Sequence, residues 1–147
     1  MAVNATSEDL RASVLPQFFP AHWLEDAPDM LFSVFPSRIR VGYVLRENGS
    51  YSYVMRSSIE ERGVALKEVH DAALRNLRDL PMPGLTIGRT PGGPEAFLGD
   101  VDDNFKAARL LLPDVQHQIA LELGSECLAS IPCRDWFLCW SMNQAPE

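Results

Sequence analysis

The clearest pattern in the chain is an alternation of apolar and polar residues over residues 38–46, which is typical of a β-strand. Asn48 and Gly49 follow this strand, and both residue types tolerate the positive φ angles of a two-residue hairpin turn. Residues 51–56 then return as a partner strand. The pattern therefore predicts a β-hairpin, with one face formed by Ile39, Val41, Tyr43 and Leu45.

Apolar residues at three- and four-residue steps predict helix over residues 57–80. Gly63 is a poor helix-interior residue, so it is expected to divide the stretch into a short first turn and a main helix. Pro81 ends the helix because its ring excludes the preceding helical geometry. Two capping boxes fit its start, one from Ser57 to Glu60 and one from Ser58 to Glu61.

The second half of the chain repeats the order of strands and helix. A helix is predicted from Asp102 or Asp103 through residue 112, and Pro113 either kinks it or opens a new helix that ends at Gly124. Residues 136–141 fit a strand or a short helix. The remaining strand candidates are residues 85–90, 95–98 and 126–131.

Strand–strand–helix blocks predict an α+β fold with an antiparallel or mixed sheet, formed as a single compact domain. Within it, residues 38–147 are interpreted as the α+β domain. Residues 1–37 are a Pro- and aromatic-rich segment that packs on its core, with a short helix over residues 7–15 capped by Ser7.

Composition and charge then narrow the classes of partner. The 147 residues include 13 Lys and Arg against 20 Asp and Glu, a net charge of −7. This disfavours binding to nucleic acid and to anionic membranes, and it suits a basic protein partner or simple solubility. No apolar run approaches the ~20 residues of a membrane span. Three unpaired cysteines (Cys127, Cys133 and Cys139) indicate neither a disulfide framework nor a zinc site, so a cytoplasmic protein without metal or cofactor is expected.

Four ionisable residues near the C-terminus form one candidate ligand site: Asp103, Arg109, Arg134 and Asp135. Arg109 and Asp135 are predicted to pair, either as a structural ion pair or as a clamp for an anion with Arg134 as second donor. Asn76 lies on the apolar stripe of the main helix, where a polar side chain must find hydrogen bonds. It is interpreted either as a ligand-orienting amide or as a tie to nearby backbone near Pro81 or Gly99.

Two further candidate sites are disfavoured by the sequence. Residues 100–104 resemble the start of a calcium loop, but the positions that require Gly and Glu hold Phe105 and Leu111. Cys133 as a nucleophile would need a histidine base. The histidines within the predicted helices, His70 and His117, are expected on solvated surfaces.

Four aromatic residues on predicted strands are either a contact surface or part of the core: Tyr51, Tyr53, Trp136 and Trp140. The main hypothesis is a non-catalytic protein-interaction module, adaptor-, chaperone- or inhibitor-like, that binds a protein partner or its own copy. The alternative is a small-molecule-binding domain or small hydrolase with its site around Asp103, Arg109, Arg134 and Asp135. No common catalytic motif is visible, so the sequence disfavours an enzymatic function.

Several stretches taken together resemble the YtpQ-like family, a bacterial family of unknown function. They are R-I-R-V-G-Y-V-L at 38–45, A-A-L-R-N-L-R-D-L-P at 72–81, D-N-F-K-A-A-R-L-L-L at 103–112 and S-I-P-C-R-D at 130–135. The resemblance covers about the last three quarters of the chain and implies a fold and a bacterial cytosolic setting, but no activity. Longer relatives extend in both directions, so the chain is either a compact version or part of a larger assembly.

Overall fold

The computed structural model describes residues 6–35, 38–99, 103–124 and 126–142. Helices and antiparallel sheets confirm the predicted α+β class. The chain divides into two compact units, residues 1–80 and 81–147. Residues 14–20 of the N-terminal segment pair with the first strand of the predicted hairpin and lie with it in the first unit.

The first unit is built on a four-stranded antiparallel sheet around β3 (Ile39–Glu47). β1 (Val14–Pro20) pairs with one side of β3 over seven residues. The other side pairs first with β2 (Phe32–Val34) and then with β4 (Ser50–Tyr53). Asn48 and Gly49 have φ angles of 45° and 82°, so the predicted hairpin is confirmed with its turn.

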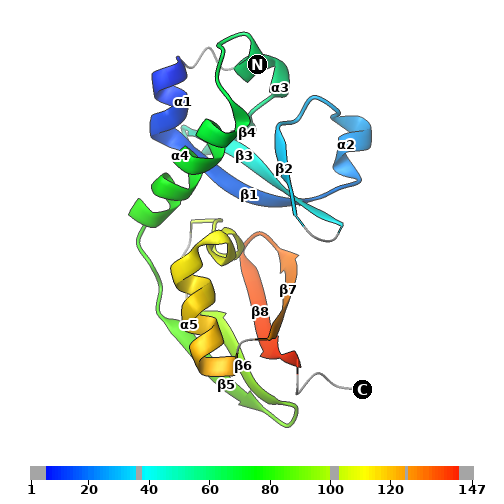
Figure 1. The fold of residues 1–147 in the computed structure, drawn as a ribbon, viewed down its shortest axis with the longest axis vertical. Helices are drawn as coiled ribbons and strands as arrows, with labels where there is room; N and C mark the ends of the chain where they lie inside the picture. Colours follow the sequence, from blue (N-terminus) through cyan, green and yellow to red (C-terminus); the bar gives the residue numbers. More distant parts are fainter. Residues whose placement is uncertain (1–5, 36–37, 100–102, 125, 143–147) are drawn as a thin grey trace. The chain divides into compact units, whose positions relative to one another are not determined.

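Two helices pack on this sheet and on each other: α1 (Ser7–Ser13) and α4 (Leu66–Asp79) (Figure 1). Thr6 rather than Ser7 caps α1, in a reciprocal capping box with Asp9. The predicted long helix does occur in two pieces, since α3 (Arg56–Glu60) precedes α4 and Gly63 lies between them with φ of 62°. The capping boxes predicted for α3 are wrong, because Met55 is its N-cap and Ser57 instead donates to Asp29.

The strand β1 was not evident from the sequence because it contains Pro16 and Pro20. Proline lacks the N–H that a sheet ladder requires, so it is tolerated on edge strands. β1 is such an edge, as it pairs with β3 alone among the described residues. Its side chains from Val14 to Phe19 are all buried, which explains why so apolar a segment is ordered in this sheet.

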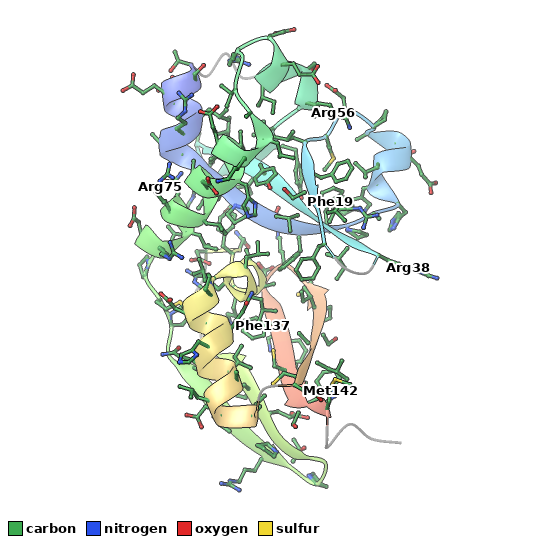
Figure 2. The ribbon with its side chains drawn as sticks, viewed as in Figure 1. Phe19, Arg38, Arg56, Arg75, Phe137 and Met142 are labelled. Atoms are coloured by element: carbon green, nitrogen blue, oxygen red, sulfur yellow. The ribbon has the colours of Figure 1, made fainter. Side chains whose placement is uncertain are left out.

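The face of this sheet away from α4 carries an aromatic cluster of Phe19, Trp23 and Tyr53 (Figure 2 labels Phe19). Trp23 comes from α2 (Trp23–Asp26). Gly42 lies beneath the cluster, where an added Cβ would fall 2.9 Å from Cδ1 of Phe19 and 3.0 Å from Cε1 of Tyr53. A larger residue at position 42 would therefore displace the rings.

The second unit contains a four-stranded antiparallel sheet with the order β5-β6-β8-β7. β5 (Leu85–Thr90) and β6 (Gly93–Leu98) form a hairpin over the strand candidates 85–90 and 95–98, and β6 begins two residues earlier than predicted. β7 (Cys127–Cys133) and β8 (Trp136–Ser141) form the last hairpin, so residues 136–141 are a strand and not a helix.

A single α-helix of this unit, α5 (Pro113–Leu123), packs on one face of the sheet among the residues described (Figure 1). Pro113 opens it at a position where a missing N–H is harmless, and Gly124 ends it with φ of 95°. The helix predicted from residue 103 is wrong: its place is taken by a loop and a short 3₁₀-helix, η1 (Ala107–Leu111). Phe137 of β8 is fully buried between α5 and the sheet (Figure 2).

Candidate functional site

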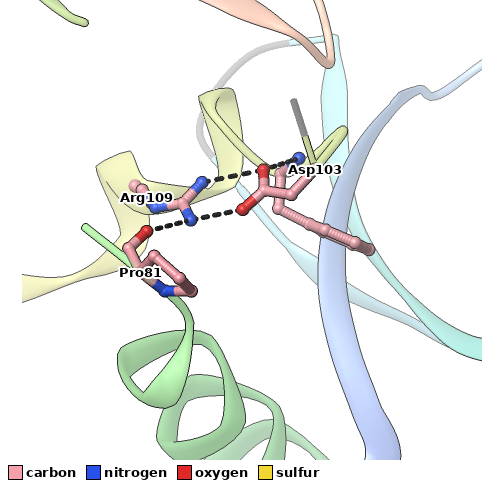
Figure 3. Close-up of polar contacts among 4 residues, drawn as sticks. Pro81, Asp103 and Arg109 are labelled. Carbon is pink, nitrogen blue, oxygen red and sulfur yellow. Dashed lines mark hydrogen bonds and ion pairs between the residues drawn. The ribbon is translucent and has the colours of Figure 1, made fainter. Parts of the chain in front are cut away.

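The most buried charged group of the described chain is the guanidinium of Arg109 in η1, whose side chain has no exposed surface. Two of its nitrogens donate to the carboxylate of Asp103, with Nη1 3.1 Å from Oδ1 (Figure 3). Nη2 also donates to the carbonyl oxygen of Pro81, at 2.9 Å. The bidentate contact orients both side chains, which is the strong form of such a pair.

The Asp103 carboxylate also shapes the loop that leads into η1. Its Oδ1 accepts the backbone N–H of Phe105 at 3.0 Å. The pair therefore fixes three stretches of the second unit: the start of the unit at Pro81, the loop at Asp103 and η1 itself. Arg109 Nε is buried without a hydrogen-bond partner among the described residues. The arrangement is that of a structural clamp whose charges are engaged internally.

Arg134 and Asp135 lie apart from this clamp in the turn between β7 and β8, and both are exposed. They contact each other at 3.7 Å, from Nε to Oδ2. The predicted pairing of Arg109 with Asp135 is thus wrong, because Asp103 occupies the guanidinium. The expected proximity of η1 to this turn is present in the backbone, where the Ala107 N–H donates to the Arg134 carbonyl at 3.0 Å.

Asn76 joins α4 to the end of α1. Its Nδ2 donates to the carbonyl oxygens of Arg11 and Val14, at 3.0 and 2.8 Å. The amide therefore satisfies carbonyls at a helix C-terminus, which would otherwise lack partners. The sequence predicted that Asn76 would hydrogen-bond to nearby backbone. It placed that backbone near Pro81 or Gly99, whereas the structure places it at the end of α1.

A hydrogen-bonded series in the first unit was missed by the sequence analysis. The buried hydroxyl of Tyr43 is hydrogen-bonded to the Ser33 hydroxyl and to Nδ1 of His70, the latter at 2.8 Å. The expectation that His70 lies on a solvated surface is wrong, as the ring is half-buried against Tyr43. The available signal was that Tyr43 shares one strand face with Ile39, Val41 and Leu45, because a tyrosine hydroxyl on a buried face requires a partner.

Burial alters the titration of both rings. It raises the pKa of Tyr43 to about 12, partly offset by the Ser33 hydrogen bond. Burial also lowers the pKa of His70, an effect that Asp71 opposes and Lys67 reinforces. His70 is accordingly neutral in the folded protein near pH 7, and protonation favours the unfolded chain.

The first unit should therefore lose stability on mild acidification. Because the folded pKa of His70 lies below its unfolded value near 6.5, its contribution is complete above that value and declines as the pH falls through it. A His70→Gln variant keeps an acceptor for Tyr43 but does not titrate, so it should show a flatter dependence between about pH 7 and pH 5. Urea unfolding followed by Trp23 fluorescence measures this, in a background where Trp136 and Trp140 are replaced by Phe. Equal slopes in both proteins would contradict the assignment.

Two of the three cysteines, Cys127 and Cys139, are poorly placed for nucleophilic chemistry. Burial raises the pKa of Cys139 to about 12, and it raises the pKa of Cys127, whose Sγ–H donates to the Gly124 carbonyl. Cys133 is exposed.

Among the described residues no group of three His, Cys, Asp or Glu side chains is placed to hold a metal. Residues 100–102 of the candidate calcium loop lie outside the described residues, and Asp103 is engaged by Arg109.

The β5–β8 sheet has a second face with a different character. Along β8, Phe137, Cys139 and Ser141 are buried, whereas Trp136 is 43% exposed and Leu138 and Trp140 are half-buried. Because side chains alternate along a strand, the latter three share the face away from α5. Strand register adds residues of the neighbouring strands to this open face. Its apolar residues are Phe97, Leu128, Trp136, Leu138 and Trp140, and it also holds Glu95 and Ser130.

The four aromatic residues proposed as a contact surface divide between the two units. Tyr51 and Tyr53 of the first unit are half-buried, and the Tyr53 hydroxyl donates to Gln17 at 3.0 Å. Trp136 and Trp140 belong to the open face. Trp140 Nε1 is buried without a hydrogen-bond partner among the residues described.

Fold and site together define an α+β protein with two antiparallel sheets, a buried arginine–aspartate clamp and one apolar sheet face that no α-helix covers among the described residues of its unit. The chain is 26% identical over 110 residues to the UPF0354 protein BH3252 of Halalkalibacterium halodurans. The match covers 75% of this chain but only 41% of that bacterial protein. No family model and no solved structure matches the chain. No helix in the described parts is long and apolar enough to cross a membrane.

Proposed function

We propose that the chain is a non-catalytic protein-interaction module whose contact surface is the open face of the β5–β8 sheet. The supporting observation is the asymmetry of β8, where one face is buried under α5 and the other leaves Trp136 43% exposed. Tryptophan and other aromatic residues are enriched in the energetically important centres of interfaces. The buried Arg109–Asp103 pair supports the same proposal, because its charges already satisfy each other.

The partner is a protein surface that combines apolar and basic side chains. The chain carries a net charge of −7, which favours association with a positively charged partner. The strand register places Glu95 opposite Trp140, on the same face of the sheet. Basic side chains around an apolar centre would complement this arrangement.

The test compares partner capture by two single variants. Trp136→Ser removes the most exposed aromatic of the open face, and Leu121→Ser removes an apolar side chain that is 71% exposed on α5. Immobilised proteins are incubated with an extract of the source organism, captured proteins are identified by mass spectrometry, and the leading one is purified for calorimetry. Loss of an exposed tryptophan that contacts the partner should weaken binding by roughly 30-fold or more.

Leu121→Ser should bind as the unchanged protein does, and the wild-type affinity should fall as salt increases. Equal effects of both substitutions would contradict the open face as the contact surface. A bound small molecule in place of a protein partner would instead favour the alternative function of a ligand-binding domain.

The family and the location belong to the same proposal. The similarity to a UPF0354 protein supports placing the chain with the bacterial YtpQ-like proteins that its sequence stretches resemble. The chain spans about two-fifths of that relative, so the module is proposed to be the counterpart of one part of a longer protein. A cytoplasmic setting fits its three free cysteines.

A further inference from the structure

The strand β7 forms one edge of the second sheet, and it pairs with β8 alone among the described residues (Figure 1). The Met142 N–H donates to the Glu126 carbonyl, which fixes the alternation of hydrogen bonding along this ladder. Leu128 and Ser130 therefore also bond toward β8. The backbone N–H and C=O groups of Cys127 and Ala129 consequently point outward from the edge.

The first half of this edge lacks the features that usually prevent strand pairing. Natural edge strands are blunted by charged residues, proline or bulges. The far end of β7 has two of these, Pro132 and a register shift between Ser130 and Cys133. Residues 127–130, with the sequence C-L-A-S, have none. One half of β7 is therefore competent to pair with another strand.

We propose that residues 127–130 of β7 pair antiparallel with the same residues of a second copy of this chain. The proposal goes beyond the proposed function, because the pair forms along the edge of the sheet and does not involve the basic partner proposed for the open face. Outward-pointing residues must face each other across such a pair. Cys127 of one copy then lies opposite Ala129 of the other, and Leu128 lies opposite Leu128 on the two-fold axis.

The residues themselves favour a second copy over an unrelated strand. An antiparallel pair of identical strands is closed by two-fold symmetry, so each outward N–H and C=O of Cys127 and Ala129 finds a partner. Leu128 is 39% exposed on the open face and would pack against its own copy, with Cβ atoms about 4.5–5.5 Å apart. In the same register Ser130 lies opposite Glu126, so no like charges oppose each other.

Pairing would also join the open faces of the two copies into one apolar surface, because the strands continue a single sheet. The net charge of −7 on each copy opposes association at long range. Salt screens this repulsion, so the dimer should strengthen as ionic strength rises. This dependence is opposite in sign to that expected for binding a basic partner.

Two lysine substitutions on the same face of β7 test the register. Leu128→Lys places two ammonium groups opposite each other on the axis and should abolish the dimer in sedimentation equilibrium up to millimolar protein. Ser130→Lys places lysine opposite Glu126 of the second copy and should leave the dimer unchanged or strengthen it. Equal effects of the two substitutions, or a wild-type protein that is monomeric throughout the concentration series, would overturn the proposal.

Disulfide trapping gives an independent answer that does not depend on a destabilising charge. In a Cys127→Ser and Cys133→Ser background, Leu128→Cys should crosslink two copies on mild oxidation, because opposed residues in a non-hydrogen-bonded pair are close enough for a disulfide. Met142→Cys, exposed at the end of β8, should not crosslink. Crosslinking at both positions or at neither overturns the second-copy assignment. The proposed function is tested separately, by whether the capture of a different protein is lost in Trp136→Ser.

Discussion

Asp103→Ala is expected to destabilise the second unit by about 3–5 kcal/mol, the usual effect of removing one partner of a buried ion pair. The Arg109 guanidinium has no exposed surface and would lose two of its hydrogen bonds. The N–H of Phe105 would lose its acceptor as well. A charged group left in the interior without its counter-ion carries most of this free-energy change.

The effect is measured by urea unfolding, together with hydrogen exchange that resolves the two units. Amides of η1 and α5 should exchange faster in Asp103→Ala, whereas those of β3 and α4 should not change. Asp135→Ala is the matched control, because its exposed contact with Arg134 spans 3.7 Å and such pairs contribute about 0–1 kcal/mol. Similar losses in the two variants would show that the buried clamp is not what holds this unit.

A double variant separates the charge effect from the packing effect. Asp103→Leu with Arg109→Met removes both charges and keeps apolar volume, so it should be more stable than Asp103→Ala alone. Recovery should be incomplete, because Phe105 still lacks an acceptor and the Pro81 carbonyl loses its donor.

Gly42→Ala is expected to destabilise the first unit by about 1–3 kcal/mol, although alanine is otherwise acceptable in a strand. The new methyl group would lie 2.9 Å from Cδ1 of Phe19, closer than carbon atoms approach without displacement. The rings of Phe19 and Tyr53 must then shift, and Trp23 contacts both, stacked on Phe19 and edge-to-face with Tyr53. The expected result is a looser aromatic cluster with a red-shifted Trp23 emission.

Thermal unfolding and Trp23 fluorescence measure this change in a background where Trp136 and Trp140 are replaced by Phe. Gly88→Ala is the control, since its added Cβ would lie 3.3 Å from Cε1 of Phe97 and requires only a small adjustment. A Gly42→Ala protein as stable as Gly88→Ala would mean that the rings accommodate the methyl group.

Local patterns predicted the elements whose signals lie within a few neighbouring residues. The alternation over residues 38–46 and the Asn48–Gly49 turn were sufficient for the first hairpin, because strand period and positive φ are properties of short sequences. The start of α5 at Pro113 and its end at Gly124 were accessible for the same reason. The α+β class followed from the order of these elements.

Contacts that depend on folded loops could not be obtained in this way. The sequence suggested a helix from residue 103, and on a helix Asp103 and Arg109, six residues apart, would lie about 120° apart around the axis and would not meet. The chain instead forms a loop before η1, which returns the Asp103 carboxylate to Arg109. The partners of Asn76 and His70 were hidden similarly, because β1 and the end of α1 are defined by tertiary pairing.

The hydrogen bond from Arg109 to the carbonyl of Pro81 has a practical consequence for anyone who divides the chain into separately expressed pieces. A C-terminal fragment that begins at Pro81 retains that oxygen, whereas one that begins at Met82 deprives a buried cation of an acceptor. The place to divide the chain is thus set by a single backbone atom of Pro81.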